Sequence, residues 1–241
     1  MKEQRLRILL TEQHPCSYLD GMQARTAFID PEVEITKELA TSLNWQGFRR
    51  SGQYMYRAQC DHCSACQPLR VLVSQFKASK SQKRTLKKNS DLSVKITTKE
   101  NLDQETLDQY FALYERYIST RHSKGDMFPP DKNQFDGFIG KIYDFSLMIE
   151  FYLEDQLIMV SLCDELHDGL SAIYTFFEPS LSSRGLGVYA ILWQLQYSAF
   201  RGYPYLYLGF WIKDCDKMTY KQKYRPNEIY VNEAWLTFTD A

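Results

Sequence analysis

The chain has 241 residues and a formal net charge of −1; 44% of its residues are hydrophobic and 24% are charged. This balance excludes a disordered chain, and no apolar run approaches the roughly 18 residues that a membrane-spanning helix needs. A net charge near zero also excludes a protein that attracts nucleic acid with its whole surface.

The amino-terminal stretch, "MKEQRLRILLTEQ", does not read as a secretory signal, because charges flank a very short apolar patch and no small-residue cleavage site follows. We therefore expect a cytoplasmic protein. In that reducing compartment the six cysteines are not expected to form structural disulfides. Up to about residue 100 the pattern is irregular, apart from an expected helix with Ile35, Leu39 and Leu43 on one face.

Residues 49–70, "RRSGQYMYRAQCDHCSACQPLR", combine paired arginines, two tyrosines and three cysteines at a repeated spacing. Three interpretations are open: a metal site, a surface for an acidic ligand, or a chance cluster on a loop. A metal site would be zinc in a closed tetrahedral site or an iron–sulfur cluster. The alternative is a set of buried thiols that only pack. The candidate metal ligands are Cys16, Cys60, Cys63 and Cys66.

Two later segments are basic. Residues 77–88 carry six basic residues and no acidic one, and residues 217–225 interleave cations with Tyr220 and Tyr224. Both compositions suit phosphate binding, and the second also suits stacking on bases. The alternative for the first segment is a solvated helix face.

A polar boundary near residues 97–104 precedes a predicted amphipathic helix, with Asp103 as its N-cap and apolar residues at helical spacing from Leu107 to Ile118. Residues 145–153, 156–163 and 170–178 are short runs rich in β-branched and aromatic residues. They predict three consecutive antiparallel strands.

The next elements are a loop, a glycine-containing turn, a long apolar helix, a strand at 205–212 and a final strand at 233–238. This order is typical of an N-acyltransferase fold of the acetyltransferase (GNAT) type. We therefore predict an α+β fold with a mixed sheet and helices in residues 101–241. Residues 1–100 are predicted to form a smaller, cysteine-containing subdomain.

The turn "RGLG", with Arg184, Gly185 and Gly187, lies where a strand passes into a helix. Glycines there let backbone N–H groups approach an anion at the helix N-terminus. In acetyltransferases this turn holds the pyrophosphate of coenzyme A, but Tyr189 stands where a small residue is usual, which counts against coenzyme A. A plain tight turn without a ligand is the alternative.

Several stretches together point to a family: "PCSYLDG", "GFRRSGQYMYRAQCDHCSACQPLRV", "FKASKSQKRTLKKNSDL", "YERYISTRHSKGDM", "DGLSAIYTFFEP", "RGLGVYAILWQ" and "YLYLGFWIKDCDKMTYKQKYRP". In this order they resemble, almost from end to end, the bacterial aspartate/glutamate leucyltransferases, relatives of the eukaryotic arginyl-tRNA protein transferases. The resemblance implies transfer of leucine from leucyl-tRNA to the N-terminal amine of proteins that begin with Asp or Glu. That addition creates a degradation signal.

The resemblance also implies that residues 1–100 recognise the acidic N-terminus of the acceptor, and it suggests roles for the residues singled out above. An acidic N-terminus needs a bidentate cation, which Arg49 and Arg50 beside Tyr54 and Tyr56 could provide; an ordinary exposed arginine pair is the alternative. Arg184, Gly185 and Gly187 would lie near the terminal adenosine of the tRNA. The candidates for the tRNA phosphates and acceptor end are Lys80, Lys83, Arg84, Lys217 and Lys221.

The implied reaction is attack of an amine on an activated ester, so the bond itself requires no cofactor. An N-terminal amine has a pKa of about 7.7 to 8.0, so a strong base is dispensable. We expect Tyr174, Tyr207 or a backbone N–H to stabilise the oxyanion, and Asp164 or Glu165 to accept a proton.

Three points stay open at this stage. The cysteines depart from the spacing of the eukaryotic relatives, where a zinc or iron–sulfur site is associated with this region, so a structural metal is one alternative and packing is the other. Arginyl-tRNA as the donor and a coenzyme A dependent N-acetyltransferase are the alternative activities. The oligomeric state is not predicted.

Overall fold

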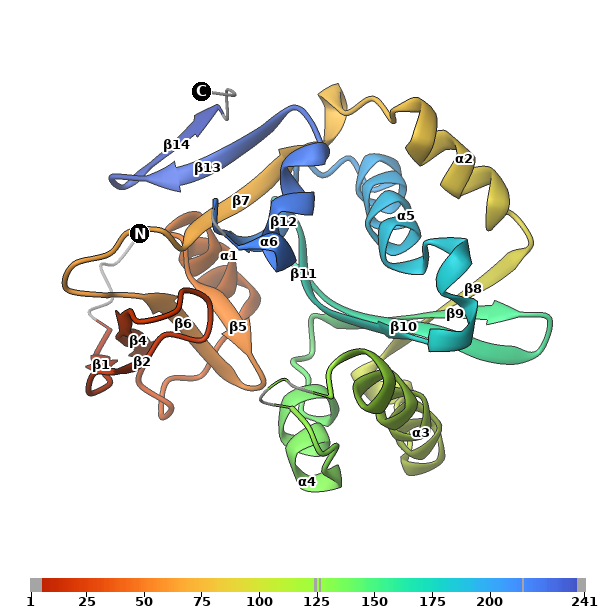
Figure 1. Ribbon diagram of the computed structural model, residues 1–241, viewed down its shortest axis with the longest axis horizontal. Coiled ribbons are helices and arrows are strands. Elements are labelled where there is room, and N and C mark those ends of the chain that lie inside the picture. The colour runs from red at the N-terminus through yellow and green to blue at the C-terminus, as the bar shows by residue number, and fades with distance from the viewer. Residues whose placement is uncertain (1–5, 124, 126, 214, 238–241) are drawn as a thin grey trace.

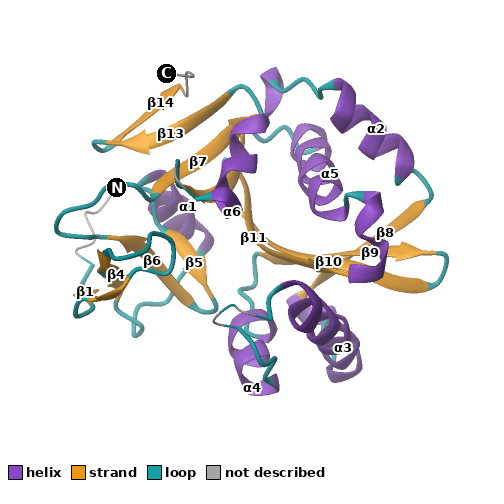
Figure 2. Ribbon diagram, in the orientation of Figure 1, coloured by secondary structure: helices purple, strands orange, loops and turns teal. Residues whose placement is uncertain are grey.

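The computed structural model describes residues 6–123, 125, 127–213 and 215–237, and it confirms the α+β class (Figures 1 and 2). Two predictions fall partly outside the described residues. Residues 1–5 belong to the stretch that does not resemble a secretory signal, and Phe238 is the end of the predicted last strand. Within the described ranges, no helix has the length and apolar character needed to cross a bilayer.

Over the described residues the larger sheet has eight strands, in the order β14-β13-β7-β12-β11-β10-β9-β8. Neighbouring strands are antiparallel except β11 and β12, which are parallel. The strands are β7 (Gln67–Leu72), β8 (Leu92–Thr98), β9 (Ser146–Leu153), β10 (Gln156–Glu165), β11 (Gly169–Phe177), β12 (Tyr205–Trp211), β13 (Asn227–Val231) and β14 (Ala234–Thr237).

A second sheet lies at the amino-terminal end of the molecule and has the order β1-β4-β6-β5, all antiparallel. Its strands are β1 (Ile8–Leu10), β4 (Thr26–Ile29), β5 (Arg49–Ser51) and β6 (Tyr54–Ala58). A two-stranded ribbon pairs β2 (His14–Pro15) with β3 (Gln23–Ala24). We refer to the four-stranded sheet as the small sheet.

Helices cover both faces of the large sheet. Figure 1 shows α2 and α5 on one face and α3 and α4 on the other. The apolar helix α5 makes the connection between the parallel strands β11 and β12. The helices are α1 (Lys37–Trp45), α2 (Lys80–Lys88), α3 (Gln104–Arg121), α4 (Lys132–Phe135), α5 (Leu186–Phe200) and α6 (Asp216–Thr219), and short 3-10 helices include η4 (Pro179–Arg184) and η5 (Tyr220–Lys223).

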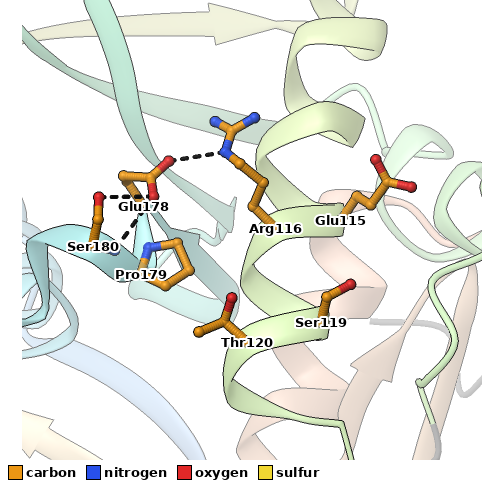
Figure 3. A pocket seen from close by; sticks show the side chains of 7 residues that line it. All are labelled: Glu115, Arg116, Ser119, Thr120, Glu178, Pro179 and Ser180. Atoms are coloured by element: carbon orange, nitrogen blue, oxygen red, sulfur yellow. Dashed lines mark hydrogen bonds and ion pairs between the residues drawn. The ribbon is translucent and has the colours of Figure 1, made fainter.

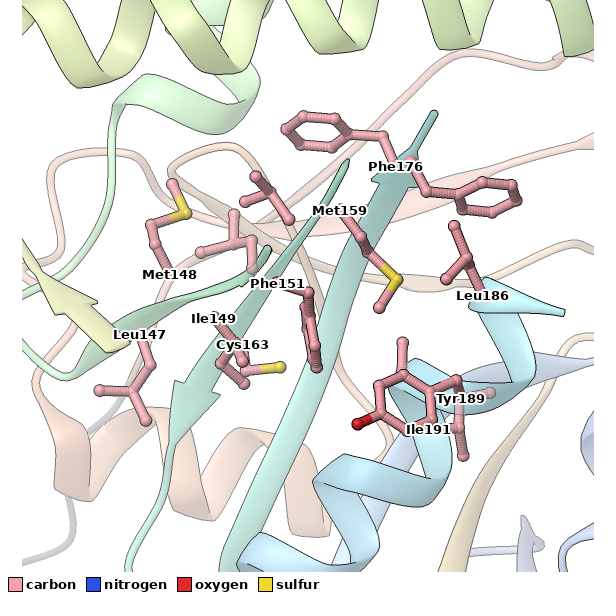
Figure 4. Close-up of a cluster of buried hydrophobic side chains, with 14 of the residues drawn as sticks. Leu147, Met148, Ile149, Phe151, Met159, Cys163, Phe176, Leu186, Tyr189 and Ile191 are labelled. Atoms are coloured by element: carbon pink, nitrogen blue, oxygen red, sulfur yellow. The ribbon is translucent and has the colours of Figure 1, made fainter. Parts of the chain in front are cut away.

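The main core lies between the large sheet and its helices (Figure 4). Tyr189 of α5 packs edge-to-face on Phe151 of β9, with ring centroids 5.7 Å apart. Tyr189, which stands where acetyltransferases usually have a small residue, is therefore part of the core. A second core joins α1 to the small sheet through Ile29, Leu43 and Met55.

Local signals in the sequence explain where the elements begin and turn. Asp103 caps α3 by accepting a hydrogen bond from the Thr106 N–H, as predicted. Ser79 and Gln82 form a capping box at the start of α2. Glu154, in the two-residue turn between β9 and β10, has a φ of 54°, as tight hairpin turns require.

The predicted helix over α3, the meander β9-β10-β11, helix α5 and strands β12 and β14 are confirmed. The expectation of an irregular first hundred residues is wrong, because they form the small sheet and also supply β7 and β8 to the large sheet. A boundary at residue 100 therefore does not separate the two sheets. Ile35 lies just before the N-cap of α1 and packs beside the second core rather than in the helix.

Candidate active site

The candidate site lies where two strands of the large sheet separate. β11 and β12 pair only over Gly169–Ser171 and Tyr205–Tyr207. Just beyond, the β12–β7 ladder shifts register between Tyr207 and Gly209, and the β10–β11 ladder also contains a shift. Irregularities of this kind bend strands and are over-represented beside active sites. We call this place, bounded by Ser171 and Ala172 on β11 and by Gly209 and Phe210 on β12, the notch.

Arg49 of the small sheet fills the notch. Its Nη1 donates to Ser171 Oγ at 3.1 Å and its Nη2 to the Ala172 carbonyl at 2.7 Å. Gly209 makes room for the guanidinium, because a Cβ there would lie 2.8 Å from Nη2, and its φ of +83° also favours glycine. The side chain is buried, and within the described residues it forms no ion pair.

Lys221 is a second buried cation at the same place. Its Nζ donates to the Phe210 carbonyl at 2.5 Å and lies 3.3 Å from Met218 Sδ. Burial, and after it the charge of Arg49, lower the pKa of Lys221 to about 7. No carboxylate in the described ranges pairs with it.

Tyrosines surround these two cations. Tyr56 lies directly opposite Arg49 in the β5–β6 ladder, and Tyr18 and Tyr220 are close enough to interact with its charge. Burial raises the pKa of all three phenols, so they stay protonated near neutral pH and can donate hydrogen bonds.

The charge balance of the notch is incomplete. A buried cation is costly unless an anion pairs with it. The charge of Arg49 reaches Lys221, yet the groups that these two side chains bond are neutral. Asp164 also acts on the charge of Arg49, but its carboxylate is already paired with Arg50. The arrangement therefore has the chemistry of a binding site for a carboxylate, with one planar bidentate donor and one ammonium group.

Arg50, predicted to share this role, does not face the notch. Alternate residues of a strand point to opposite faces, so Arg50 leaves β5 on the side away from Arg49. Its Nη1 forms an ion pair with Asp164 at 2.5 Å and bonds Ser146 Oγ at 3.0 Å, and its Nη2 donates to the Lys141 carbonyl at 2.8 Å. These contacts fasten the small sheet to β10 and correct the prediction of a paired arginine surface.

Three of the predicted catalytic groups already have strong partners in the structure. Asp164 accepts from Arg50 and from Ser146 Oγ at 2.6 Å. Glu165 forms ion pairs with Lys37 at 3.4 Å and Arg201 at 2.9 Å, and Tyr207 donates to Asp168 at 2.7 Å. We therefore assign these three residues to the scaffold.

Tyr174 differs from those groups. Its hydroxyl lies 3.6 Å from Met127 Sδ, a weak acceptor, and the side chain is half-buried. Burial raises its pKa, so the hydroxyl remains a donor. Tyr54 is exposed and lies on the same face of the small sheet as Tyr56. Tyr54 accepts a hydrogen bond from Gln53 Nε2 at 3.2 Å, and its hydroxyl can still donate to a ligand.

The basic segment 77–88 contains helix α2, which packs beside α5 and the glycine turn (Figure 1). Gly185, the N-cap of α5, has a φ of +68°, and a Cβ there would lie 3.6 Å from Thr85 of α2. Gly187 lies in the first turn of α5. The residues Lys80, Lys83 and Arg84 are exposed, and none of them forms an ion pair within the described part of the chain.

Arg184 does not point to an open phosphate site. Its Nε donates to Asn89 Oδ1 at 3.1 Å, and its Nη2 bonds the Lys88 carbonyl at 3.2 Å and pairs with Asp91. Arg184 therefore ties the glycine turn to the end of α2, and its place beside the terminal adenosine stays a prediction. The N–H groups at the start of α5 stay the predicted anion-binding element of the turn.

The second basic segment separates into two environments. Lys217 is exposed on α6, and its charge contributes to lowering the pKa of His122 at the end of α3, after burial and Arg121. Lys221, four residues later, is the buried cation of the notch. Of these two lysines, only Lys217 therefore belongs to a surface that a tRNA could reach directly.

The cysteines gather beside the tyrosines of the site. Burial raises the pKa of Cys66 to about 12, and the neighbouring thiols of Cys16, Cys60 and Cys63 add to this effect. None of the four is in a disulfide. Over the described residues, however, no group of three or more His, Cys, Asp or Glu side chains is arranged to hold a metal ion. These side-chain positions do not fit a metal, and metal binding stays a prediction.

A surface pocket of about 500 Å³ lies elsewhere, between α3 and the start of η4 (Figure 3). An ion pair between Arg116 and Glu178 at 2.9 Å crosses it, and Glu115 also lines it. Its charges are mixed, and none of the predicted site residues lines it. It lacks the cationic character of the notch.

Two features of the notch were missed at the sequence level. The role of Lys221 was missed because burial of one lysine within a basic segment leaves no trace in the local pattern. Gly209 did carry a signal, since an isolated glycine within a strand often marks a bulge or a close approach.

The chain is similar to known proteins over most of its length. Two family models match the chain, arginine-tRNA-protein transferase N terminus over residues 14–84 and arginine-tRNA-protein transferase C terminus over residues 109–231. A protein of Hahella chejuensis named aspartate/glutamate leucyltransferase is 47% identical, over 94% of this chain and 95% of its own. One of the same name from Saccharophagus degradans is 44% identical over 97% of both chains. The solved structure of FemX has a TM-score of 0.47 and 11% identity, over 80% of this chain and 65% of that one.

Proposed function

Because this chain belongs to the aspartate/glutamate leucyltransferase family, we propose that it transfers leucine from leucyl-tRNA to the N-terminal amine of proteins that begin with Asp or Glu. The observation that carries the choice of acceptor is Arg49, a buried guanidinium that lies beside Lys221 and pairs with no carboxylate within the described chain.

The acidic side chain of the acceptor supplies the missing negative charge. A carboxylate in the notch would receive hydrogen bonds from the guanidinium of Arg49 and from the ammonium of Lys221. An amide of the same shape would not neutralise the two cations and would leave them unpaired. Asp and Glu are therefore favoured over Asn and Gln.

The donor tRNA would contact the exposed basic residues of α2. Lys80, Lys83 and Arg84 are free of acidic partners within the described ranges, and α2 lies beside the glycine turn. Phosphate contacts of this kind position a nucleic acid without reading its sequence. The N–H groups at the start of α5 would receive a phosphate near the acceptor end.

The chemistry needs positioning more than it needs a strong base. The neutral N-terminal amine attacks the carbonyl carbon of the leucyl ester, an amide bond forms, and the bond to the ribose oxygen breaks. The amine loses one proton and the ribose hydroxyl gains one, so the step balances without an added cofactor. Tyr174 is the side chain that we propose as donor to the developing oxyanion, because among the described residues its hydroxyl has only a weak sulfur partner.

The function is tested by transfer of radiolabelled leucine or arginine, each charged on its tRNA, to peptides that begin with Asp, Glu or Ala. We expect leucine to be transferred to the Asp and Glu peptides and not to the Ala peptide. Transfer of arginine in place of leucine would overturn the donor, and equal transfer to all three peptides would overturn the acceptor. The Lys99→Ala variant changes an exposed residue and serves as the control for preparation and assay of a variant enzyme.

A further inference from the structure

One face of the small sheet carries a continuous row of side chains that starts at Arg49. Residues directly opposite each other in an antiparallel ladder point to the same face. Arg49 lies opposite Tyr56, Tyr56 opposite Phe28, and Phe28 opposite Leu9. The row therefore runs across all four strands, from the notch to the edge strand β1.

The rings in this row are in contact. Tyr56 packs on Phe210 of β12 with centroids 5.8 Å apart, and on Phe28 at 5.9 Å. Phe28 in turn contacts Tyr54 edge-to-face at 6.3 Å. An aromatic surface thus leads away from the boundary of the notch without a break.

The row ends in an apolar groove of about 340 Å³. Its lining carries no charged side chain, and two of its residues are well exposed, Leu10 at 48% and Tyr54 at 40%. The lining residues are Leu9, Leu10, Thr11, Phe28, Pro31 and Tyr54.

We propose that this groove binds the acceptor polypeptide downstream of its first residue, with side chains of the third to fifth positions on the aromatic row. The inference rests on the proposed function, because it places the acidic first residue at Arg49. Three inter-strand spacings from β5 to β1 span roughly 14 Å, and an extended peptide advances about 3.3 Å per residue. About four residues therefore separate the notch from the far end of the groove.

The chemistry of the groove selects this occupant. The uncharged lining offers nothing to a phosphate backbone, so the tRNA is not favoured there. The groove is continuous with the place that receives the N-terminus, and a flexible N-terminal tail is extended enough to follow it. Apolar and aromatic side chains at positions three to five would cover Leu10 and Tyr54.

The test uses the full-length enzyme, leucyl-tRNA and peptides that begin with Asp and differ only at positions three to five. One carries Leu or Phe there, and its counterpart carries Ser. We expect kcat/KM to be about tenfold higher for the apolar tail, as burial of one or two apolar side chains provides. Leu9→Ser and Leu10→Ser should reduce this ratio toward one, while the matched Ile96→Ser, 39% exposed on β8, should keep it.

The outcomes separate the two claims. Transfer to Asp peptides with the same kcat/KM for both tails would overturn the groove and leave the proposed function standing. Absence of transfer to every acidic peptide would overturn the proposed function itself. A third outcome is that the wild type forms concentration-dependent dimers, that Leu10→Ser abolishes them, and that neither tail is preferred. This result would show that a second copy of the chain occupies the groove, and it would overturn the proposal.

Discussion

Arg49 and Arg50 are adjacent in strand β5, yet they have different surroundings. Arg50 is surrounded by acceptors that include the carboxylate of Asp164, whereas Arg49, within the described chain, donates to a hydroxyl and a carbonyl. The residue types alone predicted a cationic pair, and the alternation of the strand splits it. One arginine is left for a ligand and the other holds two sheets together.

The ion pair of Arg50 gives a prediction for stability. Arg50→Met leaves Asp164 buried without a cation, so we expect a loss of roughly 3–5 kcal/mol in the free energy of unfolding. Urea denaturation measures the loss. Adding Asp164→Leu should restore much of it, because both charges are then gone. An unchanged urea midpoint for Arg50→Met would contradict the assignment.

Lys221 gives a prediction for pH dependence. Its pKa is about 7 in the folded protein against an ordinary value of 10.5, so the unfolded chain binds more protons between these values and stability rises with pH there. Lys221→Met removes the cost of the buried charge, which is full below pH 7 and declines toward pH 10.5. We expect the variant to be more stable than the wild type at pH 6, and this advantage to be smaller by about 3 kcal/mol at pH 9.

Urea denaturation of both proteins at pH 6 and pH 9 supplies the comparison. Lys223→Met, an exposed lysine two residues later, is the matched control and should show little difference at either pH. A constant difference between Lys221→Met and wild type across this range would show that Lys221 titrates normally.

At the level of elements, the sequence predicted the meander, the long helices and the order of the second half, because their apolar periodicity is strong. The small sheet was not predicted, since strands of three to five residues such as β1, β4 and β5 depend on contacts with distant parts of the chain. The candidate residues Arg49, Tyr56 and Lys221 were found by type. Their grouping was not, because Arg49 and its partner Ser171 are 122 positions apart.

The bulge in β12 is an element-scale feature with its own test. In Gly209→Ala the added Cβ would lie within 3.0 Å of the Arg49 guanidinium, and the φ of +83° would be strained. We expect kcat/KM for Asp peptides to fall at least tenfold while the affinity for leucyl-tRNA stays within twofold. The neighbouring apolar substitution Leu208→Val is the control, and an unaltered Asp peptide rate in Gly209→Ala would argue against the notch.

Helix α2 gives a prediction for salt dependence. If Lys80, Lys83 and Arg84 contact phosphates, changing all three to Gln should weaken leucyl-tRNA binding and lower the slope of log affinity against log salt by about 2–3. The slope is obtained from binding measured between about 50 and 200 mM salt, a range over which such affinities change strongly. A triple variant with the wild-type slope would remove α2 from the tRNA surface.

At the scale of the whole molecule, the site exists only where the two sheets meet. The small sheet supplies Arg49 and the aromatic row, and the large sheet supplies the notch and the support for Lys221. Arg50 and Asp164 fix this junction from the other side of β5. The proposed recognition of the acceptor therefore depends on the assembled chain, because neither sheet holds all of these residues alone.

The central claim is tested most directly with two peptides that differ only in beginning with Asp or with Asn. The measurement is the ratio of kcat/KM for the Asp peptide to kcat/KM for the Asn peptide. The two side chains have the same shape, so the ratio isolates the charge. We predict a ratio of about 100 for the wild type, as a hydrogen-bonded charge pair provides, and a ratio close to one for Arg49→Met with leucyl-tRNA binding retained. A ratio that stays near the wild-type value in Arg49→Met would contradict the account.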